Sequence, residues 1–599
     1  MTVFGDLNRL SVISDACPGE ELTLNLTETR VAIIGAGPTG LSAALFLGSQ
    51  GIPCTLFERA PTTNPHPRAT VLNGRSMEMF RQFGVTSKIE EASIPLNRHA
   101  GVGFCVTLAG ERIGTLATRG YDPARDEWER TVSPSIKRSC AQDVIEPIVL
   151  DHARQYPSVD FRFGVEVTEV TQDADQVTLN WTDSDGNTGA TKAEYVIAAD
   201  GGRSAVRESL GITMSGQSMG RQIGIYFKAD LWEYIEDEPF LLWWIYNART
   251  IGVIIALDGR HKWTYNFAYS ENEKPEDFTS ERCLKILRDA IGNDDIELEI
   301  QSILPWRMQA RVASTMRKDR IFLAGDAVHP LPPTGGIGMN TGIGDAQNLA
   351  WKLSYVLKGQ ADPSILDSYE EERLPVCTFN VEQSRHNAEK MAKNGLAGML
   401  KNDEAAAQLL ETPEGADIRA RMAAAIPSQR EHFENLGQTF AYAYASDLIT
   451  PDGTPAPETT VMDYDPVARP GHRAPAVWFA RGSDRVNSVD LFRYDRFVLL
   501  AGSDGGPWVE AFQDITAANG IPGDAYLVGP DGALQDTGDW LSLYGLTPRG
   551  AVLVRPDGHV VWRQSDGADD PTEILEKALG RSLGLRLEPR AIQMIRKEA

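Results

Sequence analysis

The sequence is poor in cysteine, with six in 599 residues, and none belongs to a CxxC pair or stands at a metal-ligand spacing from a histidine. They are Cys17, Cys54, Cys105, Cys140, Cys283 and Cys377. This scarcity argues against a zinc site or a disulfide framework, so we expect no bound metal. It is also typical of proteins from a reducing cytoplasm, which is the location that we predict.

The sequence also lacks long apolar runs and has few positively charged residues relative to negatively charged ones. No stretch approaches the roughly 18 apolar residues of a membrane span, and the first residues lack the basic start and apolar core of an export signal. Lys and Arg number 58 against 83 Asp and Glu, which gives a formal net charge of −25. Because nucleic acids and anionic membranes bind clustered Lys and Arg, we expect neither as a partner.

What is present is an ordinary globular composition, with 42% hydrophobic residues. Single cores stop growing at about 250 to 300 residues, so this length predicts two to four domains.

The clearest local pattern begins at Arg30, where VAIIGAGPTGLSAALFLGSQGIPCTLFERA predicts a strand, a glycine turn, a helix and a second strand. Gly35, Gly37 and Gly40 form a GxGxxG turn, whose missing side chains let the backbone approach a pyrophosphate at the helix N-terminus. Glu58 ends the second strand, where a carboxylate can accept hydrogen bonds from a ribose diol. This combination predicts a dinucleotide site.

A second glycine-rich loop follows the apolar segment IFLA at 321–324 and reads GDAVHPLPPTGGIGMN. Asp326 suits the hydroxyls of a polyol chain. The amides from Gly335 to Asn340 precede a helix, and such an N-terminus favours negative charge on a bound flavin ring. We expect His329 to brace this loop. The strands at 195–199 and 321–324 are expected to join the same parallel sheet as the first strand.

Between these motifs, residues 214–317 hold longer, aromatic-rich strands that predict an antiparallel sheet for the substrate. The candidates for its pocket are Tyr226, Phe240, Trp243, Trp244 and Tyr246. Because side chains alternate along a strand, only one face can line the pocket.

Three motifs together resemble the phenol hydroxylase and 2,4-dichlorophenol hydroxylase group of flavoprotein monooxygenases, called group A. They are GAGPTG followed by FERA, ADGGRSAVR at 199–207, and GDAVHPLPPTGGIGMN. The resemblance implies an α/β fold: a Rossmann-like FAD-binding domain, an inserted β-rich substrate domain and a C-terminal thioredoxin-like domain. The expected divisions are 1–29 (N-terminal extension), 30–213 and 318–396 (FAD-binding domain), 214–317 (substrate domain), 397–459 (helical linker) and 460–599 (thioredoxin-like domain without redox cysteines).

The resemblance also assigns roles around the cofactor. Asp326 would contact the ribityl chain, Arg68 the FAD phosphates and Gln142 the flavin, while Asp200 and Arg207 are associated with both FAD and the reduced nucleotide. The full set of implied cofactor residues is Gly35, Gly37, Pro38, Thr39, Gly40, Glu58, Arg59, Arg68, Gln142, Asp200, Arg207, Asp326, Pro333, Gly336, Gly338, Met339 and Asn340.

The implied activity is hydroxylation of a phenol-like aromatic compound by FAD, NADPH or NADH, and O2, through a flavin C4a-hydroperoxide. A base should take the phenol proton, but Thr70 stands where relatives carry His or Asp, so Tyr246 and His261 are the candidate replacements. Baeyer-Villiger or other flavin-peroxide oxygenation of a polyketide-like substrate is an alternative, and a non-catalytic flavin-binding sensor or assembly protein is a second. A halogenase is disfavoured because WxWxIP is absent. A homodimer is expected.

Overall fold

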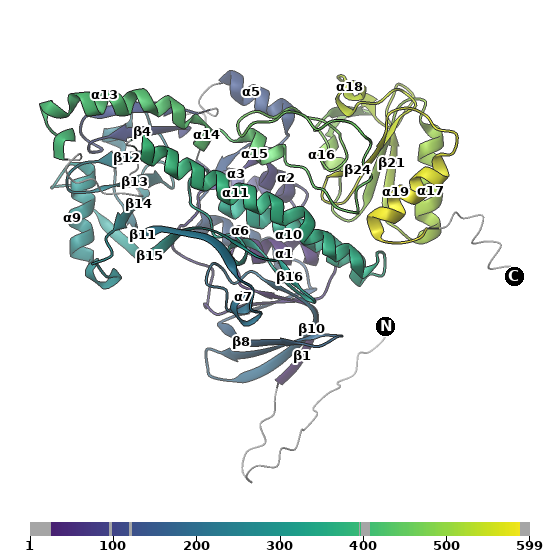
Figure 1. Ribbon diagram of the computed structural model, residues 1–599, viewed down its shortest axis with the longest axis horizontal. Coiled ribbons are helices and arrows are strands. Elements are labelled where there is room, and N and C mark those ends of the chain that lie inside the picture. The colour runs from purple at the N-terminus through teal and green to yellow at the C-terminus, as the bar shows by residue number, and fades with distance from the viewer. Residues whose placement is uncertain (1–24, 95–98, 119–122, 395, 397–407, 588–599) are drawn as a thin grey trace, which may run out of the picture.

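The computed structural model describes residues 25–94, 99–118, 123–394, 396 and 408–587 (Figure 1). None of the helices within these ranges is both long enough and apolar enough to cross a membrane.

An eight-stranded sheet organises the first domain, with the strand order β16-β17-β10-β1-β2-β7, while β8 and β9 extend it from β10. The strands are β1 Asn25–Ile34, β2 Cys54–Glu58, β7 Val159–Phe163, β8 Val165–Gln172, β9 Val177–Asp183, β10 Thr188–Ala198, β16 Arg317–Lys318 and β17 Ile321–Leu323. β1 pairs in parallel with β2 and β10, and β10 with β17, as the apolar segments predicted. One expectation is corrected: residues 25–29 are not an extension, because they pair with Gly189–Ala193 as part of β1.

Three helices carry the glycine-rich and neighbouring motifs around this sheet: α1 Pro38–Ser49, α6 Gln142–Ala153 and α10 Gly338–Leu357. α1 is apolar around its whole circumference because it packs against the sheet, α6 and α10. Both α1 and α10 begin just beyond the carboxyl ends of parallel strands, where an open α/β sheet binds ligands.

A seven-stranded sheet forms the second layer, with the order β15-β11-β14-β13-β12-β4-β5. Its strands are β4 Gly101–Cys105, β5 Arg112–Ala117, β11 Met214–Lys228, β12 Leu242–Tyr246, β13 Ile251–Ala256, β14 Lys262–Tyr269 and β15 Glu299–Ala313. The predicted antiparallel hairpins are present, but the boundaries 214–317 were too narrow, since β4 and β5 come from the earlier segment. Helix α9, Ser280–Ile291, covers the face that carries Ile223, Ile225 and Phe227.

The long helix α11, Ser368–Lys393, runs across the centre of the molecule (Figure 1). The expected helical linker is only partly helical: α13 Ala416–Ala425, α14 Arg430–Phe433 and α15 Leu436–Phe440 are followed by an irregular segment from 441 to 459. Residues 397–407 of that linker lie outside the described ranges. The shorter remaining elements before it are β3 Val71–Leu72, α2 Gly74–Arg81, α3 Thr86–Ala92, α5 Pro123–Val132, β6 Arg138–Ser139, α7 Ala205–Ser209 and α8 Trp232–Ile235.

The C-terminal unit contains a four-stranded sheet, β21-β20-β23-β24, and a three-stranded sheet, β19-β18-β22. Its elements are β18 Trp478–Arg481, β19 Asp484–Asn487, α16 Ser488–Leu491, β20 Phe497–Ala501, α17 Gly506–Asn519, β21 Gly523–Leu527, β22 Gln535–Asp536, α18 Trp540–Tyr544, β23 Ala551–Val554, β24 Val560–Gln564 and α19 Pro571–Leu583. β20 pairs in parallel with β21 and antiparallel with β23. The thioredoxin-like assignment of this unit stays a prediction.

Buried ion pairs join this unit to the first domain. Arg473 bonds to both carboxylate oxygens of Glu78 on α2, and Arg555 does the same with Glu372 on α11. All four side chains are almost fully buried. Since a buried charge is costly without its partner, these pairs fix the orientation of the C-terminal unit.

Candidate active site

The glycine turn after β1 brings three backbone segments unusually close together. A Cβ on Gly35 would lie 2.4 Å from the carbonyl oxygen of Ala199, and one on Gly40 would lie 1.9 Å from that of Gly35. Gly37 differs, because nothing lies within 4 Å of the position of its Cβ. The outer two glycines therefore close the turn, while Gly37 leaves room beside the N-terminus of α1.

Glu58 stands at the end of β2, as the sequence predicted. Its carboxylate accepts hydrogen bonds from the amides of Ala36, at 2.8 Å, and Ala60, at 2.9 Å. These bonds hold the glycine turn against the end of the neighbouring strand, and the side chain remains half-buried. Arg59, also a predicted cofactor residue, is exposed beside it.

A short 3-10 helix in the loop after β17, Gly325–Ala327, carries Asp326. The surrounding protein raises the pKa of its carboxyl, despite the opposing charges of His329 and Arg68, yet the side chain stays open to solvent. Thr39 of α1 packs directly against this loop, since its Oγ1 would lie 2.5 Å from a Cβ on Gly325. The two predicted halves of the dinucleotide site are therefore in contact.

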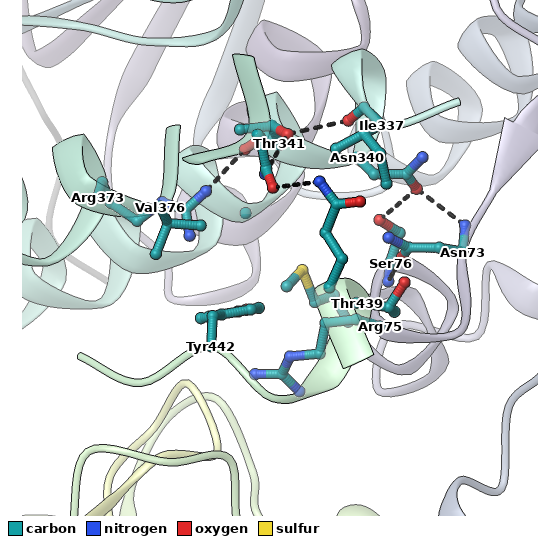
Figure 2. A pocket seen from close by; sticks show the side chains of 14 residues that line it. Asn73, Arg75, Ser76, Ile337, Asn340, Thr341, Arg373, Val376, Thr439 and Tyr442 are labelled. Carbon is teal, nitrogen blue, oxygen red and sulfur yellow. Dashed lines mark hydrogen bonds between the residues drawn. The ribbon is translucent and has the colours of Figure 1, made fainter. Parts of the chain in front are cut away.

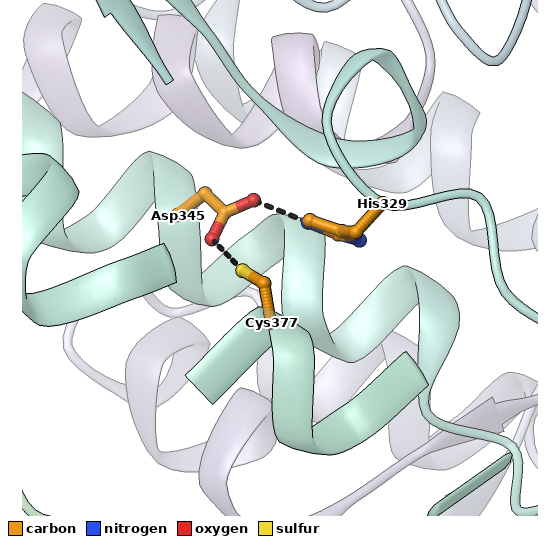
Figure 3. Close-up of side chains that lie close together, drawn as sticks. All are labelled: His329, Asp345 and Cys377. Atoms are coloured by element: carbon orange, nitrogen blue, oxygen red, sulfur yellow. Dashed lines mark hydrogen bonds and ion pairs between the residues drawn. The ribbon is translucent and has the colours of Figure 1, made fainter. Parts of the chain in front are cut away.

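His329, Asp345 and Cys377 form a buried cluster behind this loop (Figure 3), and Arg373 contacts it. Asp345 Oδ2 lies 2.6 Å from His329 Nε2 and accepts the amide of Gly325 at 3.0 Å. Its Oδ1 accepts from Arg373 Nε at 2.9 Å and from Cys377 Sγ at 3.5 Å. His329, Asp345 and Cys377 could offer metal ligands. However, hydrogen bonds from the Arg373 guanidinium and the Gly325 amide already occupy the carboxylate oxygens of Asp345. The cluster braces the loop that carries Asp326.

Helix α10 begins at Gly338 with no side-chain cap and no acidic residue in its first turn. Gly336 precedes it with a φ of 65°, and its amide donates to the carbonyl of Pro333. The free amides of such an N-terminus attract negative charge. Gly338, Met339 and Asn340 form this first turn, and their contact with a flavin ring stays a prediction.

The side chain of Asn340 has a structural role that the sequence did not indicate (Figure 2). Its Oδ1 accepts from the amide of Asn73 at 2.9 Å and from Ser76 Oγ at 2.8 Å. Its Nδ2 donates to the carbonyls of Val71 and Gly336. Only the backbone of Asn340 is therefore available to a cofactor. A small polar cavity borders these residues on the side of Arg373 and Tyr442.

Four other predicted cofactor residues surround these loops. Asp200 keeps a buried Oδ1 that has no hydrogen-bond partner within the described ranges, whereas Arg207 donates to the carbonyl of Ala327 at 3.0 Å. Gln142 holds residue 69 through two hydrogen bonds. Arg68 is exposed and close enough to Asp326 to influence its pKa.

These observations fit FAD. The space beside Gly37 suits a pyrophosphate, and the exposed carboxylate of Asp326 suits a ribityl hydroxyl. The buried Oδ1 of Asp200 can accept a hydrogen bond from the cofactor, and the N-terminus of α10 offers amides to a flavin ring.

The two predicted catalytic bases lie in unfavourable surroundings. Tyr246 is buried among apolar residues, donates to the carbonyl of Leu396 at 3.0 Å, and has its pKa raised well above normal by burial. His261 is exposed at the turn before β14, where its amide bonds to Asp258. Neither arrangement suits proton abstraction, since a base needs access to the substrate and a matched pKa.

Of the other aromatic candidates, Phe240 and Trp243 fill the core beneath α9, and Trp244 packs into the cluster with Tyr246. Tyr226 alone is half-buried on the opposite face, edge-on to His66 at 6.4 Å between ring centroids. Thr70 is half-buried, and its carbonyl accepts from the amide of Cys140.

A recess of about 630 Å³ opens beside the flavin loop. Asn435 lines it and donates to the carbonyl of Gly335 at 2.9 Å, which ties the recess to the start of α10. Both polar and apolar side chains line the recess. The lining residues are Asn73, Gly74, Ala100, Thr118, Glu129, Ile136, Lys137, Leu241, Phe433, Glu434, Asn435, Leu436 and Thr439. Sequence reasoning missed Lys137 and Asn435, because neither belongs to a recognisable motif.

Comparison with known proteins finds similar sequences and structures along most of the chain. A family model described as FAD binding domain matches residues 28–384, and one described as Aromatic-ring hydroxylase, C-terminal, matches residues 467–585. Tetracenomycin A2 monooxygenase-dioxygenase of Streptomyces glaucescens is 35% identical, covering 94% of this chain and 98% of that protein. 2,4-Dichlorophenol 6-monooxygenase of Delftia acidovorans is 32% identical, covering 93% of this chain and 98% of that protein. The solved structure of the flavin-dependent monooxygenase PieE in complex with FAD and substrate has a TM-score of 0.85 at 31% identity, covering 93% of this chain and 99% of that one.

Proposed function

Because the chain belongs to the family of FAD-dependent aromatic-ring hydroxylases, we propose that it hydroxylates a phenolic substrate with NADPH or NADH as reductant and O2 as oxidant. The enzyme is a flavin-dependent monooxygenase. When bound, FAD supplies hydride acceptance and oxygen activation, and the protein supplies binding, orientation and exclusion of water.

The recess beside Gly335 carries this proposal. It adjoins the start of α10, where a flavin ring would lie, through the hydrogen bond from Asn435 to the carbonyl of Gly335. Ile136, Phe433 and Leu436 offer apolar contacts, while Lys137 and Asn435 offer polar ones. Burial lowers the pKa of Lys137, against the pull of Glu129 and Glu434. The recess therefore suits an aromatic substrate with polar substituents.

The second candidate is Baeyer-Villiger oxygenation of a polyketide-like ketone. Thr70 supports this candidate, because threonine cannot act as the base that phenol hydroxylation needs. The two reactions differ in their requirements, since ring insertion of oxygen needs a carbonyl group and hydroxylation does not. A phenol panel without carbonyls, compared with matched aromatic ketones, separates them. A base-hydrolysable ester product identifies the second reaction.

The proposal assigns cofactor contacts to the loops already described and leaves the catalytic base open. It also places the enzyme in a reducing cytoplasm as a homodimer. The five described cysteines are all buried free thiols, which supports the reducing compartment. Light scattering of the purified protein tests the dimer.

A further inference from the structure

A separate polar site lies on the seven-stranded sheet around Gly224. A Cβ on this glycine would lie 3.0 Å from Asn266 Oδ1, 3.4 Å from His66 Nε2 and 3.6 Å from Trp306 Nε1. Three polar atoms thus surround the position that a side chain of residue 224 would occupy. We call these four residues the Gly224 cradle.

Three neighbouring strands and one loop form the cradle. Gly224 of β11 pairs directly with Asn266 of β14, and Trp306 stands on β15 opposite Gln222. His66 enters from the loop between β2 and β3. The adjacent residues Ile223 and Ile225 point into the core under α9, so the cradle occupies the other face of the sheet.

The hydrogen-bonding capacity of the cradle is specific. Asn266 Nδ2 donates to Thr264 Oγ1 at 3.3 Å, which leaves Oδ1 as an acceptor. His66 Nδ1 lies 2.7 Å from Ser302 Oγ, and in the tautomer with Nδ1 as donor, Nε2 is a second acceptor. Trp306 Nε1 can only donate. Within the described ranges, no residue hydrogen-bonds to these three atoms.

The charge state of His66 agrees with this role. Burial and the positive charge of Arg68 lower its pKa to about 4, so its imidazole is neutral near pH 7 and can accept a hydrogen bond. Arg68 also acts on Asp326, and the amide of Arg311 on β15 donates to the carbonyl of Pro330 at 3.0 Å. His66 thus shares its loop with Arg68, and β15, which carries Trp306, contacts the flavin loop further along at Arg311.

We propose that the Gly224 cradle binds the carboxamide group of the reduced nicotinamide nucleotide. A carboxamide has two N–H donors for Asn266 Oδ1 and His66 Nε2, and one carbonyl oxygen for Trp306 Nε1. A phenol has a single proton and cannot satisfy both acceptors. The half-buried indole of Trp306 adds a flat surface for the nicotinamide ring. This inference rests on the proposed function, which takes NADPH or NADH as reductant.

The test compares nicotinamide nucleotides with their 3-acetylpyridine analogues, in which a methyl group replaces the amide nitrogen while the carbonyl stays. Binding of NAD+ or NADP+ and the matching analogue to the FAD-loaded enzyme is measured by calorimetry, so no turnover is needed. The wild type should prefer the carboxamide by about tenfold, the scale of one or two net hydrogen bonds. The rate of flavin reduction by NADH or NADPH, measured anaerobically by stopped flow, gives a second, kinetic measure of the same preference.

Two variants disturb the cradle in different ways. Gly224→Ala places a methyl group among the three polar atoms, and His66→Phe removes the acceptor but keeps a ring. Both should reduce the preference to below about threefold. Gly506→Ala, at a glycine whose Cβ would meet nothing within 4 Å, and His386→Gln, on the exposed surface of α11, are the matched controls. They should keep the full preference.

Three results would overturn the inference: an equal affinity of the wild type for both nucleotides, an unchanged preference in both cradle variants, or weakened binding of 2,4-dichlorophenol with unchanged nucleotide binding. Failure of the proposed function has a different signature. In that case the nucleotide preference behaves as expected, but no phenol or aromatic ketone gives an oxygenated product.

Discussion

Asp345 on α10 holds His329 of the flavin loop at 2.6 Å, and both side chains are fully buried. Burial alone would lower the pKa of His329, but Cys377 and Asp345 raise it well above its usual value. Burial would raise the pKa of Asp345, but His329 and Arg373 lower it. The pair is therefore charged over a wide range of pH.

We expect Asp345→Asn to lower the free energy of unfolding by about 3 to 5 kcal/mol, as for other buried pairs that lose one partner. The histidine contribution is complete below its unfolded pKa near 6.5 and is lost as the pH rises through the raised folded value. The carboxylate contribution is complete above about 3.9 and is lost as the pH falls through the lowered folded value. Denaturant titrations at several pH values measure this. Equal stability of variant and wild type at pH 6 would contradict it.

Substitutions at two glycines of the glycine turn should affect folding and cofactor binding separately. Gly37→Ala should preserve the melting temperature of the apoprotein but weaken FAD binding, because its methyl group points into open space beside α1. Gly40→Ala should instead destabilise the fold by about 1 to 3 kcal/mol, since its methyl group meets a backbone oxygen. Thermal melts of the apoproteins and FAD titrations distinguish the two. Identical behaviour of both variants would refute the assignment.

Asp326→Ala should weaken FAD retention by about 1.5 to 3 kcal/mol, the value of a hydrogen bond to a charged group. The exposed turn residue Asp185 provides the control variant Asp185→Ala. Flavin absorbance after dialysis gives the occupancy. Full retention by Asp326→Ala would mean that this carboxylate does not contact the ribityl chain.

The sequence predicted those parts of the site that are encoded locally. The GxGxxG turn, Glu58 and the start of α10 each follow from a few consecutive residues. The sheet boundaries could not be obtained this way, because β12 pairs with β4 from a distant part of the chain. The alternation of side chains in FLLWWIY indicated that Tyr246 and Trp243 lie on opposite faces of the strand. It did not indicate that a hydrophobic core covers each of these faces. His66, Asn266 and Trp306 converge only after folding, so no local pattern could identify them.

Thr70→Val tests whether residue 70 takes part in proton transfer. Since valine keeps the shape and removes only the hydroxyl, we expect turnover to fall less than about tenfold, or about 1.4 kcal/mol in barrier. Removal of the true base should cost roughly 10² to 10⁴ in hydroxylation while NAD(P)H oxidation continues and releases H2O2. Product formed per nucleotide consumed gives the comparison. Complete loss of product in Thr70→Val would assign the essential role to Thr70.

The contact between the C-terminal unit and α2 should be important for stability. Arg473→Met leaves Glu78 buried with Arg75 as its remaining cationic partner, so we expect a loss of about 3 kcal/mol and a lower melting temperature. The conservative control Arg485→Met changes an exposed arginine of β19. An unchanged melting temperature for Arg473→Met would show that the C-terminal unit docks by other contacts.

In the proposed reaction, the enzyme transfers one oxygen atom from O2 to a phenolic ring and oxidises one NAD(P)H. The most direct measurement is a reaction under ¹⁸O2 with a panel of single-ring and multi-ring phenols, with mass spectrometry of the products and quantification of consumed nucleotide. We predict a product that carries one ¹⁸O in a new ring hydroxyl for each NAD(P)H oxidised. Stoichiometric H2O2 without labelled product from any phenol, or label confined to a hydrolysable ester, would contradict this proposal.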